Sequence, residues 1–155
     1  MLGSPAMDLF EETRHLLRTL EDAGASYALC GALAVAVHGA PRYTADIDLL
    51  VEATSLDAII ELAKQRGFVF GAAPMAFSDG VEVHRWSKIV EGEVLNLDLM
   101  VVSPGYQSVW KTRERVPLRD LTVTVLSREG LIQMKLVAGR PKDLMDVENL
   151  RSLDR

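Results

Sequence analysis

The sequence is poor in cysteine and aromatic residues, and it has no excess of positive charge. Its 155 residues include one cysteine, Cys30, so an internal disulfide framework is excluded and a reducing compartment is expected. Lysine and arginine number 17 against 22 aspartate and glutamate residues, which gives a formal net charge of −5. This charge argues against broad, non-specific coating of nucleic acid, although a local basic cleft is compatible with it.

No uninterrupted apolar run is long enough to cross a membrane as a helix. Residues 23–41 carry no charge if His38 is neutral, and this segment approaches the ~20 residues of a membrane span. Glycines divide the segment into two short apolar pieces, so we expect no membrane-spanning helix. The N-terminal segment has no basic region of the secretory type and contains Asp8, so we expect a cytoplasmic protein.

The hydrophobic pattern is that of a globular chain with a core, and its length favours one domain covering residues 1–155. Helices and strands alternate early, strands dominate the middle, and helices close the chain. This order predicts an α+β (mixed α/β) fold, in which a mixed β-sheet has helices packed mainly on one face. The predicted helices are 7–23, 32–37, 55–66, 127–138 and 142–150, and the predicted strands are 27–30, 46–51, 68–70, 81–86, 94–102 and 121–126.

Two aspartates stand out on the otherwise apolar strand 46–51. Asp46 and Asp48 are two residues apart, so their side chains point to the same face, about 6–7 Å apart along the chain. Two like charges on a largely apolar strand are costly unless a positive charge lies between them. Their oxygen ligands suit Mg²⁺ or Mn²⁺.

A third carboxylate has a similar setting on the strand 94–102. Asp98 shares one face of that strand with Asn96, and it joins Asp46 and Asp48 if the two strands are neighbours. Three carboxylates on neighbouring strands can hold two metal ions about 3.5–4 Å apart. The alternative is that the aspartates cap strand ends that face water.

Gly31 follows a buried strand and opens a helix. At such a turn, backbone N–H groups and the helix N-terminus can receive an anion such as a nucleotide phosphate. An ordinary strand-to-helix turn would also use a glycine here, so this feature alone does not distinguish the two interpretations.

These features form one pattern: Gly31-Ala32, then residues 33–45, then Asp46-Ile47-Asp48, and later Asp98. The pattern resembles the nucleotidyltransferase superfamily, which has the polymerase-beta-like fold. Members of that family carry a Gly-Gly or Gly-Ser turn, then Asp-x-Asp between apolar residues, and a third Asp on a later strand. The resemblance implies a nucleotidyltransferase-like mixed β-sheet.

Two segments narrow the resemblance to bacterial nucleotidyltransferases of the abortive-infection and toxin–antitoxin type. They are Arg42-x-Thr44-x-Asp46-Ile47-Asp48 and the segment from Lys135 to Val147. The resemblance implies a nucleoside triphosphate as substrate and Mg²⁺ or Mn²⁺ as cofactor. The implied metal ligands and catalytic residues are Asp46, Asp48 and Asp98; the implied nucleotide-binding residues are Gly31, Ala32, Arg42, Thr44, Lys135 and Arg140; Asp143 and Asp146 are expected to orient them.

Each of these supporting residues also has a plain structural alternative. Arg42 could be a solvated loop residue, and Lys135 could extend from an apolar helix to water. Asp143 and Asp146 share one face of the last helix, which could be an ordinary surface helix.

The predicted function is metal-dependent transfer of a nucleoside monophosphate to a hydroxyl group of tRNA, a protein or a small molecule. The family resemblance suggests the toxin of a toxin–antitoxin pair, with a cognate antitoxin as partner. One departure matters, because Ala32 cannot supply the hydroxyl that a serine at this position would offer to the phosphates. The alternatives are therefore a degenerate, non-catalytic binding protein and a small-molecule (drug) adenylyltransferase.

Two other features bear on the choice of chemistry. Basic residues from Lys111 to Arg119 flank Trp110 and could hold RNA, although a solvated face is the more common use of such a run. Cys30 lies in a buried apolar strand, so nucleophilic catalysis by the thiol is not expected.

Overall fold

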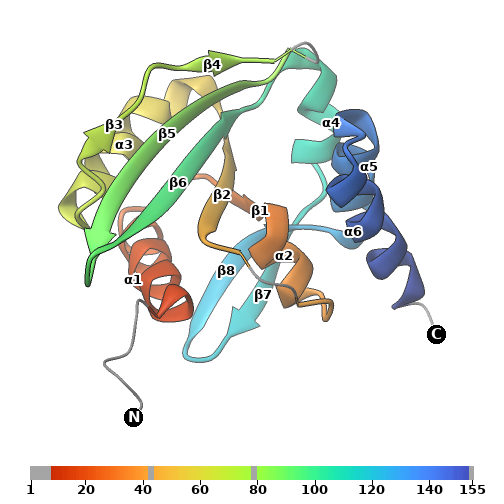
Figure 1. The fold of residues 1–155 in the computed structure, drawn as a ribbon, viewed down its shortest axis with the longest axis horizontal. Coiled ribbons are helices and arrows are strands. Elements are labelled where there is room, and N and C mark those ends of the chain that lie inside the picture. The colour runs from red at the N-terminus through yellow and green to blue at the C-terminus, as the bar shows by residue number, and fades with distance from the viewer. Residues whose placement is uncertain (1–7, 42–43, 78–79, 154–155) are drawn as a thin grey trace.

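A computed structural model describes residues 8–41, 44–77 and 80–153, which form one mixed, eight-stranded sheet with helices around it (Figure 1). The strand order is β3-β5-β6-β2-β1-β8-β7, and β4 pairs with β5. The strands are β1 (Ala28–Cys30), β2 (Asp46–Val51), β3 (Phe70–Gly71), β4 (Met75–Ala76), β5 (Glu82–Val90), β6 (Glu93–Val101), β7 (Arg113–Leu118) and β8 (Leu121–Leu126). This arrangement confirms the predicted α+β fold class.

Five of the six α-helices in the described residues form two groups, and the second helix packs against β1 and β2. The first helix and the third lie behind the strands β5 and β6, whereas the last three helices gather beyond β1 and β8 (Figure 1). In the described ranges, no helix combines the length and the apolar character that a bilayer crossing requires. The α-helices are α1 (Leu9–Asp22), α2 (Gly31–Val37), α3 (Leu56–Gln65), α4 (Gln107–Trp110), α5 (Arg128–Ala138) and α6 (Pro141–Ser152), and short 3₁₀ turns cover Ala53–Ser55 and Pro104–Tyr106.

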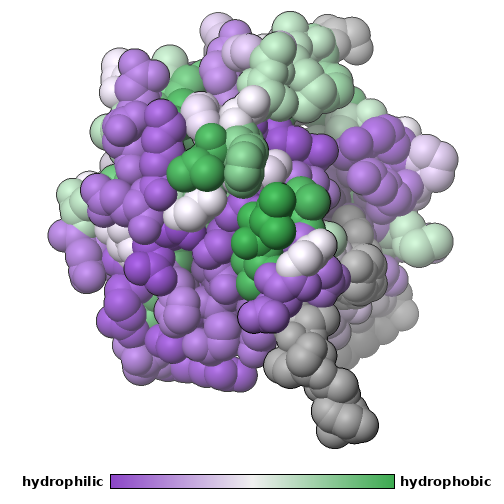
Figure 2. All heavy atoms as spheres, turned by 60° about the vertical axis from the view of Figure 1, so that its left-hand side comes forward, coloured by the Kyte–Doolittle hydropathy of each residue, from purple (hydrophilic) through white to green (hydrophobic). Residues whose placement is uncertain are grey.

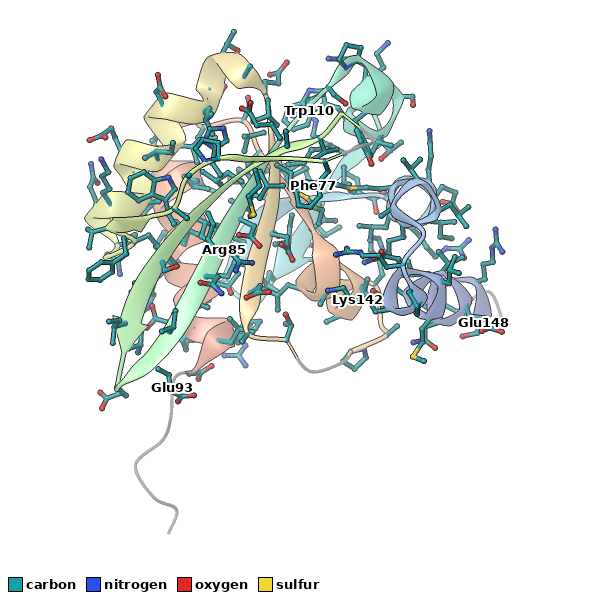
Figure 3. The ribbon with its side chains drawn as sticks, turned by 45° about the horizontal axis from the view of Figure 1, so that its top comes forward. Phe77, Arg85, Glu93, Trp110, Lys142 and Glu148 are labelled. Carbon is teal, nitrogen blue, oxygen red and sulfur yellow. The ribbon has the colours of Figure 1, made fainter. Side chains whose placement is uncertain are left out.

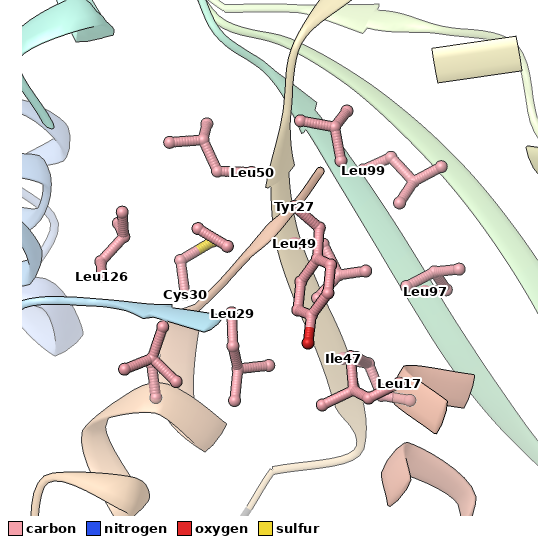
Figure 4. Close-up of a cluster of buried hydrophobic side chains, with 14 of the residues drawn as sticks. Leu17, Tyr27, Leu29, Cys30, Ile47, Leu49, Leu50, Leu97, Leu99 and Leu126 are labelled. Atoms are coloured by element: carbon pink, nitrogen blue, oxygen red, sulfur yellow. The ribbon is translucent and has the colours of Figure 1, made fainter. Parts of the chain in front are cut away.

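The two faces of the central strands differ in chemistry. Ile47 on β2 and Leu97 on β6 are fully buried, and they pack close to Leu17 of α1 (Figure 4). Side chains alternate along a strand, so the neighbours of these residues point to the opposite face. The aspartates of β2 and β6 are among those neighbours, so the apolar core holds the strands that present the acids.

Local signals fix the two helices that close the chain. The side chain of Ser127 accepts a hydrogen bond from the backbone N–H of Gly130 at 3.0 Å and caps the start of α5. Gly139 ends α5 in the left-handed conformation, with φ of 65°. Asp143 accepts from the backbone N–H of Arg140 at 3.1 Å, which caps α6. The tight connection holds the C-terminal end of α5 close to the first turn of α6.

The sequence pattern did not predict β4, β7 or the short helix α4. Strand β7 lies at the edge of the sheet and pairs only with β8 among the described strands. An edge strand can expose charged side chains and can contain a proline, here Pro117, which cannot donate a ladder hydrogen bond. The sequence of β7 therefore lacks the apolar pattern that predicts a strand.

We expect alanine substitutions on opposite faces of β6 to have very different costs. Leu97→Ala removes a fully buried side chain and should lower the free energy of unfolding by about 2–5 kcal/mol. Val94 is 55% exposed and belongs to the mainly hydrophilic exterior, of which Figure 2 shows one side, so Val94→Ala should change stability by less than about 0.5 kcal/mol. Urea unfolding of both variants checks this, and similar losses would contradict the assignment of the two faces.

Candidate active site

The register of the two central strands brings the three predicted carboxylates together. Strands β2 and β6 are parallel neighbours, with Asp48 directly opposite Asp98 and Asp46 opposite Asn96. Paired strands lie about 4.8 Å apart, so all three acids occupy one small area on the same face of the sheet. The prediction from the sequence required these two strands to be neighbours, and in the structure they are.

The surroundings of Asp48 shift the pKa of its carboxyl group. Burial and the nearby charges of Asp98 and Asp46 raise the pKa of Asp48 to about 7, while Lys135 and Lys142 act in the opposite direction. Burial is the largest cause of this shift and the two neighbouring carboxylates add to it, so a cation placed beside Asp48 would be stabilised.

Arg85 on β5 binds the third acid directly. It lies opposite Asp98 in the antiparallel pairing of β5 and β6. Its Nε donates to Oδ1 of Asp98 at 2.7 Å and its Nη2 donates to Oδ2 at 2.8 Å, so the guanidinium engages both carboxylate oxygens. This contact raises the pKa of Arg85. Figure 3 shows Arg85 on the open sheet surface beside β6.

A second hydrogen-bonded chain orients Asp46. The side-chain amide of Asn96 donates to Oδ1 of Asp46 at 3.2 Å, and the hydroxyl of Ser87 donates to Oδ1 of Asn96 at 2.7 Å. The β5–β6 hairpin therefore contributes a positioning contact to two of the three acids, in addition to Asp98 itself.

The turn between β1 and α2 passes directly against Asp48. Gly31 has a φ of +70°, and a Cβ at this position would overlap the Asp48 carboxylate, so both backbone angle and space require glycine. Ala32 is buried, so its methyl group belongs to the packing and not to an open surface. The hydroxyl of Thr44 accepts from the backbone N–H of Asp46 at 3.2 Å, which holds the start of β2. Arg42 lies outside the described residues.

The segment from Lys135 to Asp146 forms a buried group of charges. Lys135 is only 7% exposed, and its Nζ lies 2.8 Å from Asp146 and 3.8 Å from Asp143, both of which are buried. Arg140 donates to Asp143 from Nε at 2.6 Å. The alternatives of a lysine that reaches into water and of a plain surface helix are therefore wrong for Lys135, Asp143 and Asp146.

Three contributors to the site were not assigned a role from the sequence. They are Arg85 and Asn96 on the hairpin and Lys142 on α6, whose charge reaches Asp48 (Figure 3). Alternation along β6 places Asn96 on the face of Asp98, so this signal was available in the sequence. Arg85 depends on the pairing of β5 with β6, and Lys142 depends on where α6 packs.

The chemistry of the donors fits a hard divalent ion, because the three acids offer only carboxylate oxygens. Among the residues that the structure describes, no three His, Cys, Asp or Glu side chains are arranged to hold a metal ion together. Both oxygens of Asp98 accept hydrogen bonds from Arg85. The guanidinium therefore supplies the positive charge that a metal ion would supply to this carboxylate. The donor type therefore fits the ion, whereas the three carboxylates, with Asp98 bound to Arg85, do not surround one ion in this arrangement.

The basic stretch beside Trp110 and the thiol of Cys30 were the other two features with possible chemical roles. Arg113 stacks on Trp110 at 3.8 Å from the ring centroid, Arg115 lies 2.8 Å from Glu21, and these contacts take up much of the basic stretch. Cys30 is buried, and burial together with the Asp48 charge raises the pKa of its thiol, which disfavours the reactive thiolate.

No protein-family model matches the sequence, and no curated protein matches it. Solved structures match over nearly the whole chain. TM1012 from Thermotoga maritima, a candidate nucleotidyltransferase, is 20% identical with a TM-score of 0.68, over 93% of this chain and 91% of that one. ANT(2'')-Ia in complex with adenylyl-2''-tobramycin is 13% identical with a TM-score of 0.62, over 93% and 88%. JHP933 from Helicobacter pylori is 15% identical with a TM-score of 0.56, over 92% and 66%.

These similarities establish that the chain has the nucleotidyltransferase fold, as the sequence resemblance implied. At such low identity they concern the fold alone, because one fold can host several activities.

The raised pKa of Asp48 should make the stability of the metal-free protein depend on pH. Because the folded state holds a proton that the unfolded state loses near pH 4, this contribution to stability is lost as the pH rises through about 7. The free energy of unfolding of Asp48→Asn relative to wild type should therefore increase by roughly 2–3 kcal/mol between pH 5 and pH 8. Urea unfolding in EDTA measures this difference, and parallel pH profiles would contradict it.

Asp146, one of the two buried acids on α6, should contribute strongly to the stability of the folded state. Asp146→Ala leaves the buried amine of Lys135 with Asp143 at a longer distance, and we expect a loss of about 3–5 kcal/mol in unfolding free energy. Glu148, an exposed acid on the same helix, provides the control, and Glu148→Ala should cost less than about 0.5 kcal/mol. Comparable losses in chemical unfolding would show that the buried ion pair has no special importance.

Proposed function

We propose that this chain is a metal-dependent nucleotidyltransferase that moves a nucleoside monophosphate from a nucleoside triphosphate to a hydroxyl group. The observation that carries the proposal is the register of two parallel strands, which sets Asp98 opposite Asp48 and beside Asp46. The nucleotidyltransferase fold supports it, and so does the pKa of Asp48, which burial and the neighbouring charges of Asp98 and Asp46 raise to about 7.

Asp46, Asp48 and Asp98 would hold Mg²⁺ or Mn²⁺, since their carboxylate oxygens are the ligands that these ions prefer. Such an ion, when bound, neutralises charge on the transferring phosphate and lowers the pKa of the attacking hydroxyl. The residues of this chain hold the acids in place: Asn96 orients Asp46, Gly31 leaves room for Asp48, and Arg85 holds Asp98.

Cations from the C-terminal helices would bind the triphosphate. Lys135 and Lys142 both act on the charge of Asp48, so they lie on the side of the cluster toward α5 and α6. Lys142 is exposed and can reach a phosphate directly, while Lys135 is fixed by its ion pair with Asp146. Arg140, Thr44 and the backbone at Gly31 and Ala32 would complete the nucleotide contacts, and Arg42 remains a prediction outside the described residues.

The chemical step transfers the nucleotidyl group between two oxygens. The acceptor hydroxyl oxygen attacks the α-phosphorus, a new P–O ester bond forms, and the bond from the α-phosphorus to the pyrophosphate oxygen breaks. Asp98 would accept the proton of the hydroxyl, and pyrophosphate leaves with the electron pair of the broken bond. Arg85 binds both oxygens of Asp98 in this structure, so proton acceptance is favoured once one of them is released.

Ala32 does not by itself argue for a degenerate protein. The residue is buried, and the turn is defined by Gly31, whose backbone conformation and contact with Asp48 are intact. A serine at this position would add one hydroxyl group to a site that already has basic side chains from α5 and α6. We therefore infer that the site is catalytic, and an inactive nucleotide-binding protein is the outcome that would overturn this inference.

We infer that the acceptor is a small hydroxyl compound. ANT(2'')-Ia, whose structure contains adenylyl-2''-tobramycin, matches 93% of this chain in fold. The basic residues beside Trp110 are engaged with acidic and aromatic partners, which weakens the case for an RNA surface. The tRNA or protein acceptor and the antitoxin partner of a toxin–antitoxin pair stay predictions from the sequence resemblance.

The decisive experiment follows label from α-³²P triphosphates, with Mn²⁺ or Mg²⁺, into three acceptor pools: aminoglycosides, tRNA and protein. We expect transfer to a small hydroxyl compound, with loss on the order of 10²-fold or more in Asp46→Asn and in Asp98→Asn. Asp120→Asn is the matched control, because Asp120 is an exposed acid paired with Arg14 and Arg18, and it should retain activity.

Two results would contradict the proposal. Label on tRNA or protein alone would overturn the small-molecule acceptor. Absence of transfer to every pool, combined with nucleotide binding that does not depend on Asp46 or Asp98, would support a non-catalytic binding protein.

A further inference from the structure

We propose that Arg85 is a positioning residue that occupies Asp98 in the nucleotide-free protein and restricts the access of a divalent ion to that carboxylate. The proposal rests on the function proposed above, since it concerns the same three acids. It adds an order of events, in which Asp98 becomes an ion ligand only after Arg85 has found another anionic partner.

The contact between Arg85 and Asp98 uses every oxygen that the carboxylate has. The two hydrogen bonds, at 2.7 and 2.8 Å, form a parallel fork between the guanidinium and the carboxylate. Asp98 is 8% exposed, so water cannot readily replace this partner. Each oxygen keeps a second lone pair, but an ion bound there would lie beside the guanidinium, so a divalent ion competes with Arg85 for the charge of Asp98.

Arg85 differs from the other basic side chain on the same strand. Lys88 points to the opposite face, where Nζ donates to Glu12 at 2.6 Å and to the backbone carbonyl of Arg66 at 2.7 Å. Its contacts fasten α1 and the end of α3 to the sheet. Arg85 makes its hydrogen bonds only to Asp98 among the described residues, so its contact has no comparable role in joining elements.

The exposure of the two partners shows which one can move. The side chain of Arg85 is 36% exposed, whereas that of Asp98 is 12% exposed. A long side chain that borders solvent can turn away at little packing cost, whereas an aspartate on a central strand has a short side chain with few alternatives. Arg85 is also within the field of Asp46 and Asp48, which keeps it at the cluster until a stronger anion arrives.

A nucleoside triphosphate is such an anion, and a guanidinium binds phosphate with the same two-pronged geometry. When Arg85 moves to a phosphate oxygen, Asp98 loses its positively charged partner. Its carboxylate is then free to bind a divalent ion. Nucleotide binding and ion binding at Asp98 then favour each other, as linkage between two sites requires.

The test is Mn²⁺ binding to the nucleotide-free protein, measured by electron paramagnetic resonance of the free ion. Arg85→Gln should bind Mn²⁺ at least about tenfold more tightly than wild type, because Asp98 has lost its competing partner. Arg85→Lys keeps the positive charge but loses the fork, and it should also bind more tightly than wild type. Arg115→Gln removes an arginine that pairs with Glu21 away from the cluster, and it should leave the affinity unchanged.

A second comparison separates occupation of Asp98 from a general effect of charge. In an Asp98→Asn background, Arg85→Lys should no longer change the Mn²⁺ affinity. Thermal unfolding gives an independent readout, because Mn²⁺ should raise the Tm of Arg85→Gln by more than it raises the Tm of wild type. This measurement also shows whether each variant folds.

Equal Mn²⁺ affinity of wild type and Arg85→Lys, with both proteins folded, would overturn the proposal. So would a gain in Arg85→Lys that persists in the Asp98→Asn background. These results are separable from failure of the proposed function, because the wild-type protein could still transfer label from the triphosphate in either case.

Discussion

The concentration of three carboxylates on one face of two neighbouring strands is the constraint that the rest of the site must satisfy. Asp48 and Asp98 face each other across the parallel pairing of β2 and β6, and Asp46 is one pleat away. Burial of the Asp48 carboxyl, together with weakly screened repulsion from Asp98 and Asp46, raises its pKa to about 7. Three features accommodate the cluster. Gly31 leaves space for the Asp48 carboxylate, Asn96 donates a hydrogen bond to Asp46, and Arg85 pairs with Asp98.

The cations around the cluster come from two sources with different mobility. Arg85 arrives from the hairpin partner of β6 and borders solvent. Lys135 arrives from α5 and is buried, which is possible only because Asp146 and Asp143 on α6 pair with it. One source is therefore rigid and fixes the C-terminal helices beside the strands, whereas the other is able to exchange partners.

The sequence predicted the parts of the site that depend on local periodicity. Alternation along β2 puts Asp46 and Asp48 on one face, and the bounds of that strand were correct. The sequence could place Asp98 beside Asp48 only if β2 and β6 were assumed to pair, because pairing between strands 50 residues apart is set by the whole sheet. Arg85 had no local signal, since its partner lies across the hairpin, and the predicted strand at 81–86 ended before that hairpin. The burial of Asp143 and Asp146 depends equally on the packing of α6 against α5.

The balance of charge explains why the site is incomplete without a ligand. Among the described residues, five acids (Asp46, Asp48, Asp98, Asp143 and Asp146) lie around four basic side chains (Arg85, Lys135, Arg140 and Lys142). The acids of α6 take up Lys135 and Arg140, and Asp98 takes up Arg85, so Asp46 and Asp48 are left with Lys142 and carry the one excess negative charge. A bare triphosphate would add to this repulsion, whereas divalent ions that arrive with the triphosphate offset part of the negative charge of both. The same negative charge around Asp48 thus favours a metal-bound nucleotide over the bare nucleotide.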